Sequence, residues 1–242
     1  KKDLKKFSLR MGKSLRRRGP DYSGFWIEKD LKLCLSHQRL SIIDLSKRSN
    51  QPMESENERF VLVYNGEVYN YKKIRNQLSK NNINFKTDSD TEVILEAFSF
   101  WGVKKSLNLL DGMFAIALWD KHSNDLYLIR DRLGIKPLYF YRDNNNFVFS
   151  SEIKAFKELP WLNFEIDYQA FSSYVRLNYV PTPKSIYKNI RKLEPGNILK
   201  INLGNKLTKE PFWDLTKVVK KNEIEKSSVS IVAELEKMLE EK

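Results

Sequence analysis

Four β-rich segments follow one another between residues 113 and 151 and are joined by short connections. They are MFAIALWD (113–120), DLYLIRD (125–131), PLYFY (137–141) and NFVFSS (146–151). The connection KHSND (121–125) carries Ser, Asn and Asp, which turns favour. Strands joined this closely pair as antiparallel neighbours, because a parallel pair requires a crossover of roughly a dozen residues or more. The pattern disfavours a parallel doubly wound sheet.

The rest of the chain adds strands and helices in an order typical of an α+β fold. We predict strands over 31–40, 60–65 and 197–203, and helices over 71–81, 89–102 and 167–177. The helix over 89–102 has Ser89 or Asp90 as its N-terminal cap and ends at Gly102. Antiparallel strands with helices inserted between some of them predict packed layers of sheet and helix.

Length and composition narrow the class of protein. A chain of 242 residues is long enough for one large domain, and no apolar run approaches the roughly 18 residues that a membrane span requires. The single cysteine, Cys34, excludes an internal disulfide framework. Because no hydrophobic signal segment is seen either, a reducing cytoplasm is favoured over secretion. Two histidines, His37 and His122, leave little for a His-based metal site.

The net charge of +12 is concentrated in the first residues. Residues 1–18 hold nine Lys or Arg against Asp3 alone, which accounts for +8 of the total. An apolar stripe recurs there at helical spacing, formed by Leu4, Phe7, Met11 and Leu15. This pattern indicates a basic surface helix with one stripe packed inward. No zinc-knuckle pattern, RNA-binding aromatic signature or phosphate-binding loop supports a nucleic-acid partner.

The C-terminal segment has a different character. From Asp214 onward the chain is polar and rich in Lys, and it then forms an apolar helical stripe made of Val229, Ile231, Val232, Leu235, Met238 and Leu239. Such a stripe fits a connector to a further domain or a helix docked on its own domain. The sequence leaves both interpretations open.

Three features carry chemistry, although each has a simpler structural explanation. Asn65-Gly66 at the expected end of strand 60–65 could offer a side-chain amide and a backbone N–H to a developing oxyanion, or could form a turn. Arg39 could hold a carboxylate in a bidentate pair or form a surface salt bridge. Asp90 could pair with an ammonium group or cap a helix. Taken singly, the structural explanations are favoured.

The order of seven motifs resembles a known family. They are RRGPD (17–21), HQRLSIIDLS (37–46), QPM (51–53), YNGEVYNY (64–71), SDTEVIL (89–95), LDGMFAIALWD (110–120) and RDRLGIKPLYF (130–140). Together they resemble the N-terminal, class II glutamine amidotransferase domain of glutamine-hydrolysing asparagine synthetases. The resemblance continues through PTPKSIYKNIRKLEPGNIL (181–199) and fades near residue 213.

The resemblance implies a fold and a binding site. The fold would be that of an N-terminal-nucleophile hydrolase, an αββα sandwich with two antiparallel sheets between helical layers. Arg39 would hold the α-carboxylate of glutamine, and Glu67 and Asp90 would receive the α-ammonium group. Asn65 and Gly66 would form the oxyanion hole. The backbone of the loop after Arg39 would line the same pocket, through Leu40, Ser41, Ile42 and Ile43.

The sequence departs from the family in one respect. The family's nucleophile is a cysteine at the N-terminus, whose own α-amine acts as the base and which precedes a first strand. This chain starts at Lys1, already in the following helix, and Cys34 within strand 31–40 is interpreted as a packed structural residue. We therefore expect residues 1–213 to form an amidotransferase domain without its first strand. Residues 214–242 are expected to form a linker and the first helix of an ATP-dependent synthetase domain.

The resemblance implies the glutaminase part of an asparagine synthetase, inactive as this chain alone. Glutamine would be the substrate here, with no cofactor in this domain and no nucleic-acid or membrane partner. Aspartate, ATP and Mg²⁺ would bind a second domain of the full-length protein. The alternatives are a degenerate, non-hydrolytic glutamine-binding or interaction module, and an amidotransferase with another acceptor such as a sugar. The oligomeric state, including a homodimer, is left open.

Overall fold

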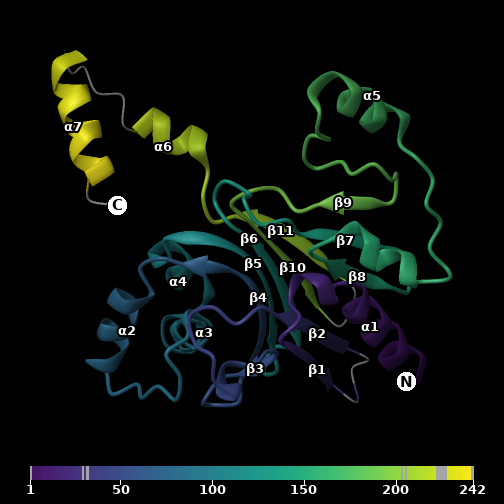
Figure 1. The fold of residues 1–242 in the computed structure, drawn as a ribbon, viewed down its shortest axis with the longest axis horizontal. Coiled ribbons are helices and arrows are strands. Elements are labelled where there is room, and N and C mark those ends of the chain that lie inside the picture. Colours follow the sequence, from purple (N-terminus) through teal and green to yellow (C-terminus); the bar gives the residue numbers. More distant parts are fainter. Residues whose placement is uncertain are drawn as a thin grey trace.

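The computed structural model describes residues 2–28, 30, 33–202, 204, 206–221 and 228–240. These residues stack in four layers, with helices on the outside and two layers of antiparallel strands between them (Figure 1). The layered α+β fold predicted from the sequence is confirmed.

A six-stranded antiparallel sheet forms the centre of the molecule. Its strand order is β11-β10-β6-β5-β4-β3. The strands are β3 (Met53–Glu54), β4 (Phe60–Val68), β5 (Gly112–Asp120), β6 (Asp125–Arg130), β10 (Asn197–Asn202) and β11 (Leu207–Pro211). The predicted hairpin is confirmed, because β5 and β6 pair down to Asp120 and Asp125 and the turn contains Asn124 with a positive φ of 55°.

Both faces of this sheet are buried, and the side chains alternate between them. Leu62 and Ile116 face a helical layer, and Val63 and Ala117 face the second layer of strands. The helices are α2 (Tyr71–Ser79), α3 (Asp90–Trp101) and α4 (Val103–Leu109), which lie together on one side of the sheet in Figure 1. Burial on two faces explains why these strands are almost continuously apolar in sequence.

The second layer of strands consists of two separate small sheets. One pairs β1 (Tyr22–Glu28) with β2 (Leu33–Arg39), and the other has the order β8-β7-β9, with β7 (Tyr139–Arg142), β8 (Phe147–Ser150) and β9 (Ile190–Lys192). Leu35 from β2, together with Phe140 and Phe149 from the other sheet, packs into the same apolar cluster against the large sheet. The two small sheets therefore form one layer without being hydrogen-bonded to each other.

The basic N-terminal segment forms the outer helix that covers this layer. Helix α1 (Lys2–Ser14) is followed by the short 3₁₀ helix η1 (Arg16–Arg18) and packs beside η3 (Ile153–Glu158). Phe7 and Met11 contact the apolar cluster around Phe156, and Arg10 forms an ion pair with Glu158 at 3.0 Å. The prediction of a basic helix with one stripe packed inward is confirmed.

Within the described ranges, each small sheet has a strand edge that no other strand covers, and both edges border the same groove. β1 covers one edge of β2, and β7 covers one edge of β8. The other edges of β2 and β8 border a groove of about 1270 Å³, which α1, β4 and β5 also line. Open edges expose unpaired N–H and C=O groups, which can form hydrogen bonds with a further strand.

The C-terminal elements extend away from the layers. Helix α5 (Tyr168–Leu177) begins with Asp167 as its cap, and α6 (Leu215–Lys221) and α7 (Ser228–Glu240) lie apart from the sheets in Figure 1. The described apolar side chains of the α7 stripe are 50–69% exposed: Ile231, Val232, Leu235, Met238 and Leu239. Within the described chain, α7 is not docked on its own domain.

We predict that the purified chain self-associates as its concentration rises, because β2 and β8 both present open strand edges. Size-exclusion chromatography with light scattering across a concentration series measures this. A monomer at every concentration, with a melting temperature above about 65 °C and hence beyond the usual mesophilic range, contradicts the prediction.

Candidate active site

Asn65 and Gly66 lie inside a strand, which corrects the sequence-based expectation that they end one. β4 continues to Val68 and pairs Asn65 with Ala115 and Gly66 with Phe114 of β5. Asn and Gly are depleted in strand interiors, so their presence suggested a strand end. Pairing with β5 keeps this backbone extended nevertheless.

The close approach of β5 requires glycine at position 66. A Cβ atom at Gly66 would lie 2.2 Å from the carbonyl oxygen of Met113 and 2.8 Å from the Cα atom of Phe114. Both are backbone atoms of a paired strand, so they cannot turn aside as a flexible side chain can. Any other residue would force the two strands apart here.

The backbone groups of β4 alternate between two edges of the strand. Odd-numbered residues bond to β5, and the N–H of Tyr69 continues this series by donating to the carbonyl of Asp111. Even-numbered residues therefore face the opposite edge, which β3 covers only at its beginning. Tyr64, Gly66 and Val68 face a part of that edge that no strand of the described chain covers.

Along this edge, side chains accept hydrogen bonds from the backbone N–H groups two residues before and two residues after Gly66. The N–H of Tyr64 donates to Oε1 of Gln51 at 2.6 Å, and the N–H of Val68 donates to Oδ2 of Asp90 at 3.1 Å. No described residue accepts the Gly66 N–H between them. The Gly66 N–H therefore remains available to donate a hydrogen bond to a ligand.

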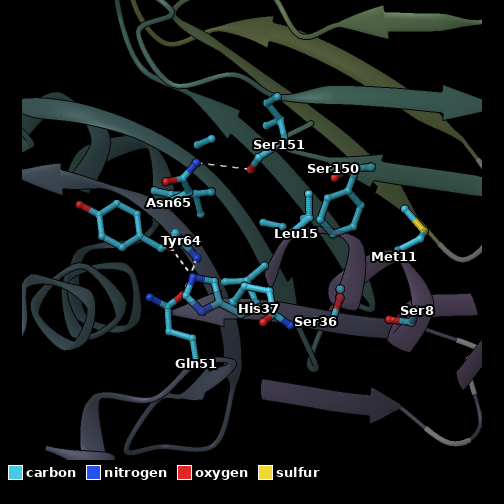
Figure 2. Close-up of a pocket in the computed structure, with 18 of the residues that line it drawn as sticks. Ser8, Met11, Leu15, Ser36, His37, Gln51, Tyr64, Asn65, Ser150 and Ser151 are labelled. Atoms are coloured by element: carbon cyan, nitrogen blue, oxygen red, sulfur yellow. Dashed lines mark hydrogen bonds between the residues drawn. The ribbon is translucent and has the colours of Figure 1, made fainter. Parts of the chain in front are cut away.

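The side-chain amide of Asn65 points into the groove beside this donor. Its Nδ2 lies 3.5 Å from Oγ of Ser151, just beyond the end of β8 (Figure 2). A hydrogen bond of this length is weak and easily exchanged for a better acceptor. The amide and the Gly66 N–H together offer the two donors that a developing oxyanion needs.

Ser89 caps α3, which leaves the carboxylate of Asp90 for the site. The Ser89 hydroxyl accepts the N–H of Glu92, whereas Asp90 is 5% exposed and accepts the Tyr64 hydroxyl at 2.7 Å. Burial raises the pKa of Asp90, hydrogen bonds oppose this rise, and the negative charge of the exposed Glu67 adds to it. Two neighbouring carboxylates at the end of β4 attract a cation.

Arg39, at the end of β2, donates hydrogen bonds to the following loop and also lines the groove. Nη1 donates to the Ser46 carbonyl and to Oδ1 of Asn50, both at 2.8 Å, and Nη2 donates to the Asp44 carbonyl. A guanidinium has about five N–H donors, so Nε–H and one Nη2–H remain. Nε and Nη2 form one edge of the guanidinium, and such an edge can bind both oxygens of a carboxylate.

The loop after Arg39 forms the rim of the groove. Leu40, Ile42 and Ile43 line it with largely exposed apolar side chains, and Ile42 is 74% exposed. Ser41 does not line the groove, and its N–H donates to the Asp21 carboxylate at 2.7 Å. The structure thus places three of the four predicted loop residues at the groove.

Asp44 fastens this loop to the segment before α3. Its carboxylate accepts the N–H of Ser46 at 2.6 Å and the N–H of Asp88 at 2.9 Å. Partial burial opposes ionisation, but these hydrogen bonds outweigh it and hold the pKa of Asp44 well below its ordinary value. The carboxylate therefore stays charged, and the attachment holds, at any physiological pH.

His37 and Gln51 are site residues that the sequence reasoning did not single out, although both stand in the quoted motifs. Nε2 of His37 lies 3.1 Å from the carbonyl oxygen of Tyr64, which can only accept, so Nε2 carries the hydrogen. Burial lowers the pKa of His37 to about 4, the hydrogen bond to Tyr64 opposes this, and the charge of Arg39 contributes. The imidazole is neutral at pH 7.

Cys34 is not arranged as a nucleophile. Burial raises the pKa of its thiol to about 11, and the charge of Lys5 only partly opposes this. Alternation along β2 places Cys34 toward α1, whereas His37 lies on the opposite face toward β4. The thiol stays protonated at neutral pH, as expected for a structural cysteine.

Features of two other kinds of site are absent from the described residues. No helix there is long and apolar enough to cross a membrane. Across those same ranges, no cluster of three or more His, Cys, Asp or Glu side chains is suited to hold a metal ion.

The layers and the groove place the chain in a known class of folds. It superposes on the Bacillus subtilis glutamine phosphoribosylpyrophosphate amidotransferase with a TM-score of 0.56 and 23% identity, over 74% of this chain and 35% of that one. A likeness at this level shows the fold, and the predicted αββα sandwich with two layers of antiparallel strands is confirmed.

The chain belongs to the glutamine amidotransferase domain family, whose sequence model matches residues 1–213. It is 36% identical to a putative glutamine-hydrolysing asparagine synthetase 2 of Methanocaldococcus jannaschii, over 89% of this chain and 45% of that protein. It is 34% identical to asparagine synthetase 1 of Bacillus subtilis, over 87% of this chain and 33% of that protein. The chain thus spans less than half the length of these relatives.

We predict that His37 makes stability depend on pH between about 6.5 and 4. The unfolded chain binds a proton in this window and the folded chain does not, so the free energy of unfolding decreases as the pH falls through it. The decrease amounts to about 2–3 kcal/mol. Urea unfolding at a series of pH values measures it.

The matched variants are His37→Gln, which cannot titrate, and His122→Gln, which alters an exposed histidine. His37→Gln should flatten the pH dependence relative to the unsubstituted chain, and His122→Gln should not. Equal slopes for all three proteins would refute the assignment.

Proposed function

We propose that this chain is the glutaminase part of an asparagine synthetase, which hydrolyses glutamine to glutamate and ammonia for the ATP-dependent amidation of aspartate. The observation that carries the proposal is the uncovered Gly66 N–H beside the Asn65 amide, in a groove that Arg39 and Asp90 also line. The names of the relatives support the synthetase assignment over a non-hydrolytic module or a sugar amidotransferase.

In this proposal glutamine lies along the groove with its two ends held by opposite charges. The Nε/Nη2 edge of Arg39 receives the α-carboxylate, and Glu67 and Asp90 receive the α-ammonium group. The backbone of the loop 40–43 lies against the substrate. The side-chain amide of glutamine then reaches Asn65 and Gly66.

The chemistry is acyl transfer through a cysteine thiol. The sulfur attacks the side-chain amide carbon, and the α-amine of that cysteine takes the thiol proton. Asn65 and Gly66 stabilise the oxyanion that forms, and the proton passes to the departing ammonia. Water then attacks the thioester, which releases glutamate and regenerates the thiol.

We place the nucleophile on an extended segment in the groove between β2 and β8. Both strands offer an unpaired edge there, and the groove of about 1270 Å³ passes beside Asn65. A strand led by an N-terminal cysteine and continuing into α1 would pair with both small sheets and bring its thiol to the oxyanion donors. Such a segment would precede residue 1.

The remaining assignments concern the whole protein. Residues 1–213 would form the glutaminase domain, and residues 214–242 would lead into a synthetase domain that binds ATP, Mg²⁺ and aspartate. The greater length of the relatives accommodates such a domain. We place the protein in the cytoplasm, with glutamine as the ligand of this domain, no cofactor there, and a homodimer as one assembly to test.

We predict that the 242-residue chain binds glutamine weakly and releases no ammonia from it. Arg39→Ala should abolish this binding, because the charge-assisted contacts to the carboxylate contribute on the order of 1.5–3 kcal/mol. Isothermal titration calorimetry with glutamine measures the affinity.

Asn50→Ala is the matched control for this experiment, because it removes one loop contact of Arg39 and leaves the Nε/Nη2 edge intact. Its affinity should stay within about threefold of the parent, a change of under about 0.7 kcal/mol. If Asn50→Ala weakens binding as much as Arg39→Ala does, the guanidinium acts through the loop and not on the ligand.

We predict a different outcome for Asn65→Ala, which removes a donor that acts chiefly on the transition state. In a protein extended at its N-terminus by a strand with a leading cysteine, it should lower the turnover of glutamine by about 100-fold or more. The affinity should be nearly unchanged. Steady-state glutaminase assays decide this: an inactive extended protein, or unchanged turnover in the variant, overturns the assignment.

A further inference from the structure

On the uncovered edge of β4, Tyr64 and Gly66 have opposite requirements for hydrogen-bond partners. Tyr64 and Gly66 both face this edge, so a strand paired along it would take the hydrogen-bonding groups of both residues. The proposed reaction needs the Gly66 N–H to stay free. Tyr64, by contrast, is 4% exposed, and buried backbone groups cannot remain without partners.

Two side chains supply hydrogen-bond partners to the backbone of Tyr64 without covering Gly66. Oε1 of Gln51 accepts the Tyr64 N–H at 2.6 Å, and Nε2 of His37 donates to the Tyr64 carbonyl at 3.1 Å. Figure 2 shows both side chains gathered next to Tyr64, with Asn65 beyond them. Both backbone groups of Tyr64 are satisfied, and the edge at Gly66 stays uncovered.

We propose that His37 is a positioning residue for the oxyanion hole. Its hydrogen bond holds the carbonyl of the peptide unit between Tyr64 and Asn65, and so fixes the direction in which the Asn65 side chain and the Gly66 N–H point. The inference rests on the proposed function, because it names a residue that supports the same site.

The chemistry of the imidazole suits this role. A ring has few rotatable bonds, so its N–H is held in a fixed direction once the ring is packed. Nε2 is committed to Tyr64 and therefore does not act as a base in the reaction. Nδ1 of His37 is buried without a partner among the described residues, which costs stability. A purely apolar side chain would avoid this cost but could not hold the carbonyl.

The kinetic test compares three substitutions in the extended, cysteine-led protein. His37→Leu removes the donor, His37→Gln keeps an N–H near the position of Nε2, and His122→Leu makes the same chemical change at an exposed site. We expect His37→Leu to lower kcat by about 10- to 100-fold with KM within about twofold. His37→Gln should recover most of the rate, and His122→Leu should match the parent.

A double-substitution cycle tests whether His37 acts through the oxyanion donors. In the Asn65→Ala background, His37→Leu should reduce kcat by a clearly smaller factor than in the parent, because one of the two donors that His37 positions has been removed. An undiminished effect in that background, or a kcat for His37→Leu within twofold of the parent, overturns the inference.

A spectroscopic test is independent of activity and uses the 242-residue chain. In ¹⁵N-labelled protein, the Gly66 backbone and Asn65 side-chain amide resonances should shift in His37→Leu and stay unshifted in His122→Leu. Unshifted resonances in His37→Leu overturn the inference. An inactive extended protein with shifted resonances counts instead against the proposed function alone.

A third substitution covers the case in which His37→Leu does not fold. His37→Asn is too short to reach the Tyr64 carbonyl, whereas His37→Gln is long enough, so the two differ in the contact while both remain polar amides. The Asn65 and Gly66 resonances should shift in His37→Asn relative to His37→Gln. Identical resonances in the two variants overturn the inference.

Discussion

The unpaired edge of β4 is the constraint on which the rest of the site depends. A strand interior normally gives its N–H and C=O groups to neighbours on both sides, and burial makes an unpaired group costly. β4 satisfies this demand with residues from three other elements, namely His37 on β2, Gln51 before β3 and Asp90 on α3. The uncovered position at Gly66 exists only because its neighbours are satisfied in this way.

The four-layer packing brings these elements to one edge. The large sheet is buried on both faces, so β4 meets α3 on one side and β2 on the other. Neither α3 nor β2 is adjacent to β4 in sequence, and the stacking of layers brings them together. The same stacking separates the two small sheets and leaves the groove beside Asn65.

Much of this fold could be predicted from the sequence, because strand alternation and helical periodicity are local signals. The hairpin after β5, the stop at Gly102 and the inward stripe of α1 all followed from them. The extent of β4 could not be predicted, since its continuation past Asn65 depends on pairing with a distant strand. The roles of His37 and Gln51 likewise depend on contacts across the fold.

The sequence could not decide which of two neighbouring residues caps α3, and the reason is physical. Ser89 and Asp90 are both good helix caps, and only the packed structure assigns the cap to Ser89 and directs the Asp90 carboxylate to Tyr64 and Val68. The guanidinium of Arg39 has a further consequence. It holds the loop at Asp44 and Asn50 and also lines the groove. If the groove binds a carboxylate at Arg39, as the proposed function requires, ligand binding and order in the loop would be thermodynamically linked, and each would favour the other to the same degree.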